Sequence, residues 1–150
     1  EEIRGGLESA VIEPGRMTPI QLERCLLVDD TYNASPQAVR AAIDWLAHQS
    51  GHRILVMGGL SELGDAASSE MKALGAYAKS QGIDQLVATG TAAPIAEGFG
   101  VGSFYAETIE ETVSHLSQMV ARTDAMLIKG SRSAHMNRVV DALQCQQGGQ

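Results

Sequence analysis

The sequence is poor in cysteine, in long apolar runs and in cations. Its 150 residues include two cysteines, Cys25 and Cys145, which excludes a disulfide framework and favours a reducing compartment. The longest apolar run, residues 54–57, is far shorter than the roughly 20 residues of a membrane-spanning helix. Lys and Arg number 11 against 18 Asp and Glu, a net charge of -7, whereas nucleic-acid binding needs an excess of cations. We therefore expect a protein of a reducing compartment with no nucleic-acid partner, no membrane span and no secretory signal.

Several motifs that carry chemistry are also missing. There is no GxxxxGKS/T phosphate loop, and the three lysines lie outside any such context: Lys72, Lys79 and Lys129. A GxGxxG stretch between a strand and a helix is absent, and no pair of histidines or cysteines has zinc-site spacing. Ser131 is followed closely by His135, but neighbours in sequence do not make a catalytic triad. We therefore expect neither a metal site nor a catalytic residue in this chain.

Short apolar runs alternate with amphipathic segments along most of the chain. The runs predicted as buried strands are Cys25–Val28, Ile54–Met57, Leu86–Ala88 and Ala125–Ile128, and Phe104–Tyr105 is predicted as a weak strand. The segments predicted as helices are about 36–49, 66–81, a brief one ended by Gly98, 108–121 and 134–143. Because such alternation is typical of parallel sheets covered on both faces, we predict a Rossmann-like three-layer α/β domain. Its mostly parallel sheet has about six strands, with an antiparallel edge hairpin closed at Glu23–Arg24.

Capping residues mark where several of these helices begin and end. Ser35 is the expected N-cap of the first helix, and Pro36 suits its first position because the missing N–H would be unpaired there anyway. Thr108 and Glu111 have the spacing of a capping box, in which each side chain accepts from a free backbone N–H. Gly82 is placed to end the second helix.

Two polar segments follow predicted strands, where ligands of open α/β sheets bind. In Lys129–Ser133, backbone N–H groups ahead of the predicted helix favour an anion, Arg132 can clamp a carboxylate and Lys129 can add a positive charge. In Asp29–Asp30, a carboxylate can accept both hydroxyls of a ribose. The alternatives stay open: the two cations can neutralise nearby acidic residues, and the aspartates can cap a helix or solvate a loop.

Four motifs occur in one order along the chain: Glu13–Arg16 (EPGR), Asp29–Pro36 (DDTYNASP), Gly58–Gly64 (GGLSELG) and Lys129–Ser133 (KGSRS). Together they resemble the C-terminal domain of the Mur ligases, and the resemblance covers essentially the whole chain. DDTYNASP with KGSRS is specific to the family member that uses D-alanyl-D-alanine, whereas the PGR turn is shared more widely. The resemblance implies that residues 1–16 end a central domain and form an interdomain linker, and that residues 17–150 are the C-terminal domain.

The resemblance implies a cytoplasmic, ATP-dependent peptide ligase of peptidoglycan synthesis, which joins D-alanyl-D-alanine to a UDP-N-acetylmuramoyl-tripeptide. In that family ATP phosphorylates the tripeptide carboxylate, and the amine of the dipeptide attacks the acyl phosphate. The phosphate loop, the Mg2+ ligands and the UDP site would belong to the enzyme's N-terminal and central domains, which fits their absence here. This chain would bind the dipeptide and close over ATP, and it would be inactive alone.

On this mapping four residues approach the nucleotide. Arg16 approaches the ATP phosphates, and Asp30 approaches the ribose hydroxyls. Tyr32 and Asn33 approach the adenine. The resemblance thus assigns a nucleotide-binding role to the start of the chain and to the DDTYNASP segment.

The same mapping gives the dipeptide to Lys129, Ser131 and Arg132, with Arg132 as the natural partner of its carboxylate. One departure from the family pattern concerns the third motif. The family usually has aspartate where this sequence has Gly59, so the role of that aspartate does not carry over. Only Glu62 of this loop is kept as a suspected site residue.

A second interpretation stays open, namely a stand-alone Rossmann-like module that binds a ligand or serves as a scaffold, because the series of strands and helices is complete in itself. The chain begins at Glu1 rather than at a methionine, so we expect it to be part of a longer protein. A phosphate loop encoded one domain upstream favours the ligase, and a start codon just before Glu1 favours the module.

Overall fold

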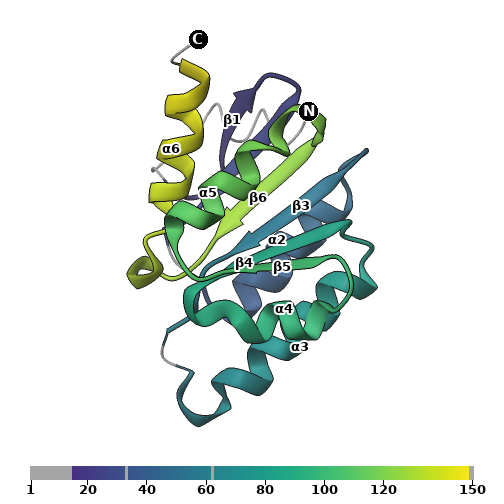
Figure 1. Cartoon of the computed structure of the whole chain (residues 1–150). Coiled ribbons are helices and arrows are strands. Elements are labelled where there is room, and N and C mark those ends of the chain that lie inside the picture. The colour runs from purple at the N-terminus through teal and green to yellow at the C-terminus, as the bar shows by residue number, and fades with distance from the viewer. Residues whose placement is uncertain (1–14, 33, 62, 149–150) are drawn as a thin grey trace.

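A computed structural model describes residues 15–32, 34–61 and 63–148 (Figure 1). The strands are β1 (Thr18–Leu22), β2 (Cys25–Asp30), β3 (Arg53–Met57), β4 (Gln85–Thr89), β5 (Ser103–Ala106) and β6 (Ala125–Lys129). The α-helices are α2 (Pro36–Ala47), α3 (Ala67–Ser80), α4 (Ala93–Phe99), α5 (Ile109–Ser117) and α6 (Asn137–Gly148). Short 3-10 helices lie at Gly64–Ala66, Gly90–Ala92, Val120–Arg122 and Arg132–Ala134. Residues 1–14, which hold most of the expected linker, lie outside the described residues.

The strands form one six-stranded sheet in the order β1-β2-β6-β3-β4-β5. Among the strands of the described residues, only the β1–β2 pair is antiparallel, and the other pairs are parallel. The edge hairpin is closed where predicted, since Leu22 pairs with Cys25 and Glu23 takes the positive φ of 50° that such a tight turn needs. The predicted class, a mostly parallel sheet with an antiparallel edge hairpin, is confirmed.

Helices cover both faces of the sheet and divide the core into two clusters (Figure 1). On one face, α2, α3 and α4 bury a cluster that includes Ile43, Leu74 and Phe99. On the other face, α5 and α6 bury a cluster that includes Leu116 and Val140. The central strands β3 and β6 supply apolar side chains to both clusters, which is why they read as continuous apolar runs.

The predicted caps are present in the structure. The Ser35 hydroxyl accepts from the Ala38 backbone N–H at 3.1 Å at the start of α2. Thr108 accepts from the Glu111 N–H at 3.1 Å, while the Glu111 carboxylate accepts from the N–H of Glu107, one residue earlier than in the expected capping box. These local contacts fix where α2 and α5 begin.

Four predicted helix boundaries are wrong, one of them the end of α6, which lies at Gly148 and not near residue 143. Helix α4 continues through Gly98 to Phe99, because Gly98 serves close packing rather than termination: a Cβ there would lie 2.0 Å from the Lys72 carbonyl oxygen on α3. Helix α5 ends at Ser117 and not near residue 121, where a 3-10 turn follows instead. Helix α6 starts at Asn137 and not at 134, because a 3-10 turn and the left-handed His135 (φ 57°) precede it.

Gly98→Ala should destabilise the domain by about 1–3 kcal/mol, the usual cost of forcing extra atoms into a packed contact. The reason is that the new methyl group would overlap the backbone of α3. The free energy of unfolding in urea measures the effect. Glu97→Ala, an exposed neighbour on the same helix, is the control and should change stability by less than about 0.5 kcal/mol. Equal stability of the two variants would contradict this account of α3–α4 packing.

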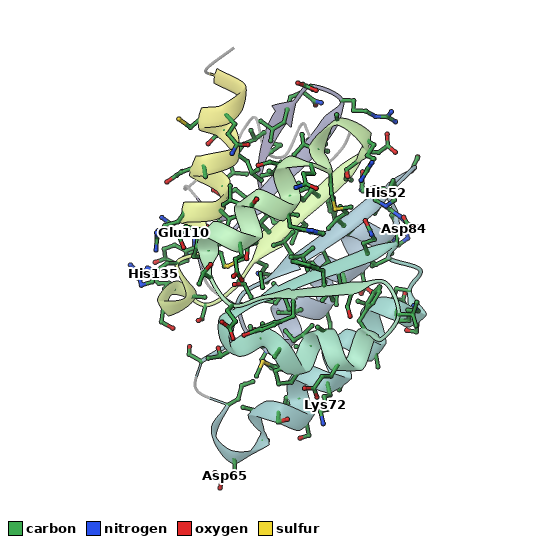
Figure 2. All side chains as sticks on the ribbon, in the orientation of Figure 1. His52, Asp65, Lys72, Asp84, Glu110 and His135 are labelled. Atoms are coloured by element: carbon green, nitrogen blue, oxygen red, sulfur yellow. The ribbon has the colours of Figure 1, made fainter. Side chains whose placement is uncertain are left out.

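The Asp124 side chain connects the residues that precede strands β2, β3 and β6, at the amino ends of the parallel strands. Figure 2 shows His52 and Asp84 at this end of the sheet. Its Oδ2 accepts from the His52 backbone N–H at 2.7 Å, and its carboxylate forms an ion pair with Arg24. The His52 N–H, followed by Arg24, holds the pKa of Asp124 below its ordinary value of 3.8. The carboxylate is thus more acidic in the folded chain than in the unfolded one.

Because the folded pKa is depressed, this stabilisation is present above pH 3.8 and is lost as the pH falls through the folded pKa. Asp124→Asn should therefore lower the urea midpoint at pH 7, and the difference from the wild type should shrink below pH 3.8. Asp141→Asn, an exposed position on α6, is the control and should track the wild type at both pH values. A difference between Asp124→Asn and wild type that does not depend on pH would rule out the carboxylate as its source.

Candidate functional site

Two cavities open at the carboxyl ends of β2 and β6, and they share Tyr32. The first, here called the Asp30 cleft, has a volume of about 490 Å³ and is lined by Arg16, Met17, Asp30, Tyr32, Ala34, Ser35, Ala38, Ala41, Ala42 and Lys129. The second, the Arg132 cleft, has a volume of about 770 Å³ and is lined by Gly15, Asp29, Tyr32, Arg132, Ser133, His135, Asn137 and Asp141. Their position is the one expected for ligands of open α/β sheets.

A buried ion pair forms the back of the Asp30 cleft. Asp30 and Lys129 are directly paired across β2 and β6, and the Lys129 Nζ lies 2.7 Å from Asp30 Oδ2. The side chains are only 3% exposed for Lys129 and 14% for Asp30, so water screens the pair weakly. The other oxygen, Asp30 Oδ1, accepts from the Met17 backbone N–H at 3.1 Å. Both carboxylate oxygens are therefore fixed by the protein.

Residues 15–17, which lead into β1, are hydrogen-bonded to Asp30 and Tyr32. Met17 has a φ of 48°, a value that few bulky residues adopt, and its N–H bond to Asp30 helps to hold this conformation. The Gly15 carbonyl accepts from the Tyr32 N–H at 2.8 Å, and the Arg16 guanidinium lies 4.0 Å from the centre of the Tyr32 ring. Arg16 and Met17 are thus part of the wall of the Asp30 cleft, and Gly15 lines the Arg132 cleft.

Tyr32 separates the two cavities and carries a second cation. The Arg132 guanidinium lies 5.1 Å from the centre of the same ring, within the range of a cation–π contact. Both arginines are therefore held near the mouths of the clefts by one partly exposed aromatic side chain. Such an arrangement concentrates positive charge next to two cavities in a chain whose net charge is -7.

The loop that carries Arg132 is anchored through its neighbours. The Ser131 N–H donates to the Gly59 carbonyl at 2.9 Å, and the Ser131 and Ser133 hydroxyl oxygens lie 3.1 Å apart. His135 then takes a left-handed conformation that turns the chain into α6. Figure 2 shows His135 at the end of the sheet opposite to His52 and Asp84, which places the loop at the carboxyl ends of the strands.

The structure brings Arg16, Asp30 and Tyr32 together in one cavity, as the mapping onto the nucleotide requires. Asn33 lies outside the described residues. Lys129, which the resemblance groups with the dipeptide, lines the Asp30 cleft and not the cleft that contains Arg132. Lys129 is only three residues from Arg132 in the sequence. The pairing of β2 with β6 nevertheless sets it beside Asp30 in the folded chain.

Arg132 lines the second cavity, whereas Ser131 is buried and lines neither cleft. Ser133 belongs to the candidate segment Lys129–Ser133, without a role of its own. Sequence reasoning missed His135, Asn137 and Asp141 as residues of the Arg132 cleft. Ser133 and His135 were noticeable as polar neighbours of Arg132, but Asp141 joins the site only through the fold of α6. The α-helix begins at Asn137, so its N-terminal N–H groups lie after the Lys129–Ser133 loop, where a 3-10 turn starts instead.

Thr91 of a neighbouring loop occupies the space beside Gly59, the position where the family usually has aspartate. A Cβ built on Gly59 would lie 1.9 Å from the Thr91 hydroxyl oxygen. Both residues line a smaller cavity of about 260 Å³ that also includes Ser133 and Glu107. A side chain at position 59 would thus have to displace Thr91. Glu62, the other suspected residue of this motif, lies outside the described residues.

The described part of the chain gives little support for a metal site, a reactive thiol or a membrane span. Within residues 15–32, 34–61 and 63–148, no group of three or more His, Cys, Asp or Glu side chains could hold a metal ion. Burial raises the pKa of the Cys25 thiol to about 11, so this thiol is a poor nucleophile at neutral pH. Among the same residues, no helix is both long and apolar enough to cross a membrane.

The chain is similar to curated ligases of the same name from several bacteria. The UDP-N-acetylmuramoyl-tripeptide--D-alanyl-D-alanine ligase of Escherichia coli (strain K12) is 38% identical over 148 residues, covering 96% of this chain and 32% of that protein. The ligase of the same name from Haemophilus influenzae is 29% identical and is also covered over 32% of its length. The chain therefore spans about a third of the length of the curated relatives it matches.

Solved structures and a family match agree with these relatives. MurF from Acinetobacter baumannii has a TM-score of 0.83 at 34% identity, covering 95% of this chain and 33% of that chain. MurF ligase from Thermotoga maritima, solved in complex with ADP, has a TM-score of 0.80 at 27% identity, covering 94% of this chain and 33% of that chain. Residues 15–132 match the family described as Mur ligase, glutamate ligase domain. The chain thus belongs to the Mur ligase family.

Proposed function

We propose that this chain is the C-terminal domain of an ATP-dependent peptide ligase that adds D-alanyl-D-alanine to a UDP-N-acetylmuramoyl-tripeptide in peptidoglycan synthesis. The observation that carries the proposal is that a chain of this family has two clefts at the carboxyl ends of its strands β2 and β6. Residues 1–16 would link it to a central domain, and residues 17–150 would form the domain itself. ATP is a cytoplasmic cosubstrate, so we place the reaction in the cytoplasm.

The Asp30 cleft is proposed to take the ribose and base of ATP. Each carboxylate oxygen of Asp30 has a further lone pair beyond its contact with the protein, which can accept a ribose hydroxyl. Three alanines of α2, Ala38, Ala41 and Ala42, give the cleft a small apolar wall that suits a flat base. Tyr32, with Asn33, would contact the adenine, and Arg16 would reach the phosphates. The structure of the T. maritima relative contains ADP, which supports nucleotide use in this family.

Mg2+ and the phosphate-activating groups are proposed to come from the preceding domains. The sequence contains no phosphate loop, and the described residues contain no carboxylate cluster suited to a metal. When bound with ATP, Mg2+ would neutralise phosphate charge on the far side of the cleft. This chain's residues would orient the nucleoside and exclude water from the acyl phosphate when the domains close.

The Arg132 cleft is proposed to take the dipeptide. A guanidinium matches a carboxylate with two parallel hydrogen bonds, and Tyr32 limits the movement of this one. Ser131 would act through the loop that its backbone fastens to Gly59. Holding the dipeptide beside the nucleotide cleft makes attack by its amine effectively intramolecular, which is the contribution of a positioning domain to rate.

Arg132→Ala in the full-length ligase should lower kcat/KM for D-alanyl-D-alanine roughly 30- to 1,000-fold, because a desolvated carboxylate would lose its partner. This loss corresponds to about 2–4 kcal/mol of transition-state stabilisation. Steady-state kinetics with the dipeptide as the varied substrate measure the loss. The matched control is Arg138→Ala, an exposed arginine on α6 that pairs with Glu110 away from both clefts. Unchanged dipeptide kinetics in Arg132→Ala would remove this residue from the site.

A further inference from the structure

Lys129 is the charged residue most deeply buried in the described part of the chain. Its residue exposure is 2%, against a much more exposed Arg132 only three positions away. Its Nζ points along the sheet toward β2 and contacts Asp30 Oδ2 at 2.7 Å. Its backbone carbonyl accepts from the Gly58 N–H at 2.8 Å, which holds the end of β6 against β3. Lys129 therefore faces the Asp30 cleft from its rear wall.

The Asp30 carboxylate is held at two points. The Met17 N–H binds Oδ1, and the Lys129 ammonium binds Oδ2. A carboxylate on a short side chain can otherwise rotate, so two donors on different oxygens fix the plane in which its remaining lone pairs point. A donor with a full charge holds its acceptor about twice as strongly as a neutral one. Lys129 thus contributes the stronger of these two restraints on the carboxylate.

We propose that Lys129 is a positioning residue of the nucleotide cleft, which acts by orienting the Asp30 carboxylate toward the ribose hydroxyls, and that it is not a ligand of the dipeptide. This inference rests on the proposed function, because it assigns Lys129 to one of the two substrates of that reaction. It separates two neighbours of one loop: Lys129 serves the nucleotide, and Arg132 serves the dipeptide. The division follows the strand pairing and not the order of residues along the loop.

The test compares two Michaelis constants in the full-length ligase. Lys129→Met keeps the length and apolar stem of the side chain and removes its charge. It should raise the KM for ATP by about 10- to 100-fold, the effect of losing a charge-assisted hydrogen bond, and change the KM for D-alanyl-D-alanine less than twofold. Arg132→Ala should show the opposite pattern. A thermal unfolding curve for each variant confirms that the protein compared is folded.

A double variant tests whether Lys129 acts through Asp30. In an Asp30→Asn background, Lys129→Met should change the KM for ATP less than threefold, because the carboxylate that it orients is gone. This double variant also leaves no buried charge without a partner, so it remains a usable comparison if the single variant folds poorly. Equal effects of Lys129→Met in both backgrounds would overturn the inference.

Other outcomes separate this inference from the proposed function. A rise in the dipeptide KM alone, equal rises in both constants, or no change would each overturn the role given to Lys129. If the wild-type ligase does not join the dipeptide, the proposed function fails. Calorimetric titration with ADP then still decides the inference: Lys129→Met should weaken ADP binding by about 10- to 100-fold, and unchanged binding would overturn it.

Discussion

The pairing of β2 with β6 determines what this end of the sheet can do, because it sets Asp30 beside Lys129 across 99 residues of sequence. Two opposite charges with little exposure stabilise each other only while both are present, and loss of one partner of a buried pair costs about 3–5 kcal/mol. The same carboxylate holds the Met17 N–H, so the pair also fixes the path by which the chain enters the domain. One ion pair thus connects fold, linker and cleft.

The two clefts form because strand ends and loops diverge on either side of Tyr32. On one side, the alanine-rich face of α2 and the Asp30–Lys129 pair make a cavity with an apolar wall and a polar back. On the other side, the loop before α6 presents Arg132. Arg16 and Arg132 both lie within cation–π distance of the Tyr32 ring, which keeps two cations at the boundary. In our proposal, the preceding domains supply the opposite walls and the groups that activate phosphate.

Local signals in the sequence predicted much of the fold. The Ser35 and Thr108 caps and the alternation of strands and helices are decided by neighbouring residues, and all appear in the structure. Gly98 was misread as a helix end because its reason lies on another helix, against the Lys72 carbonyl. The structure places Arg16, Asp30 and Tyr32, which the resemblance assigns to the nucleotide, in one cavity, but the direction of Lys129 depends on strand order. Strand order is set by tertiary packing, which no local pattern records.

The central claim is that the nucleotide and the dipeptide occupy different clefts of this chain. The most direct measurement is an amide NMR titration of the chain with ADP and, separately, with D-alanyl-D-alanine at millimolar concentrations. The account predicts that ADP shifts the signals of Asp30, Ala38 and Lys129, and that the dipeptide shifts those of residues 132–137. Perturbation of one common set of residues by both ligands, or shifts centred on His52 and Asp84 at the far end of the sheet, would contradict it.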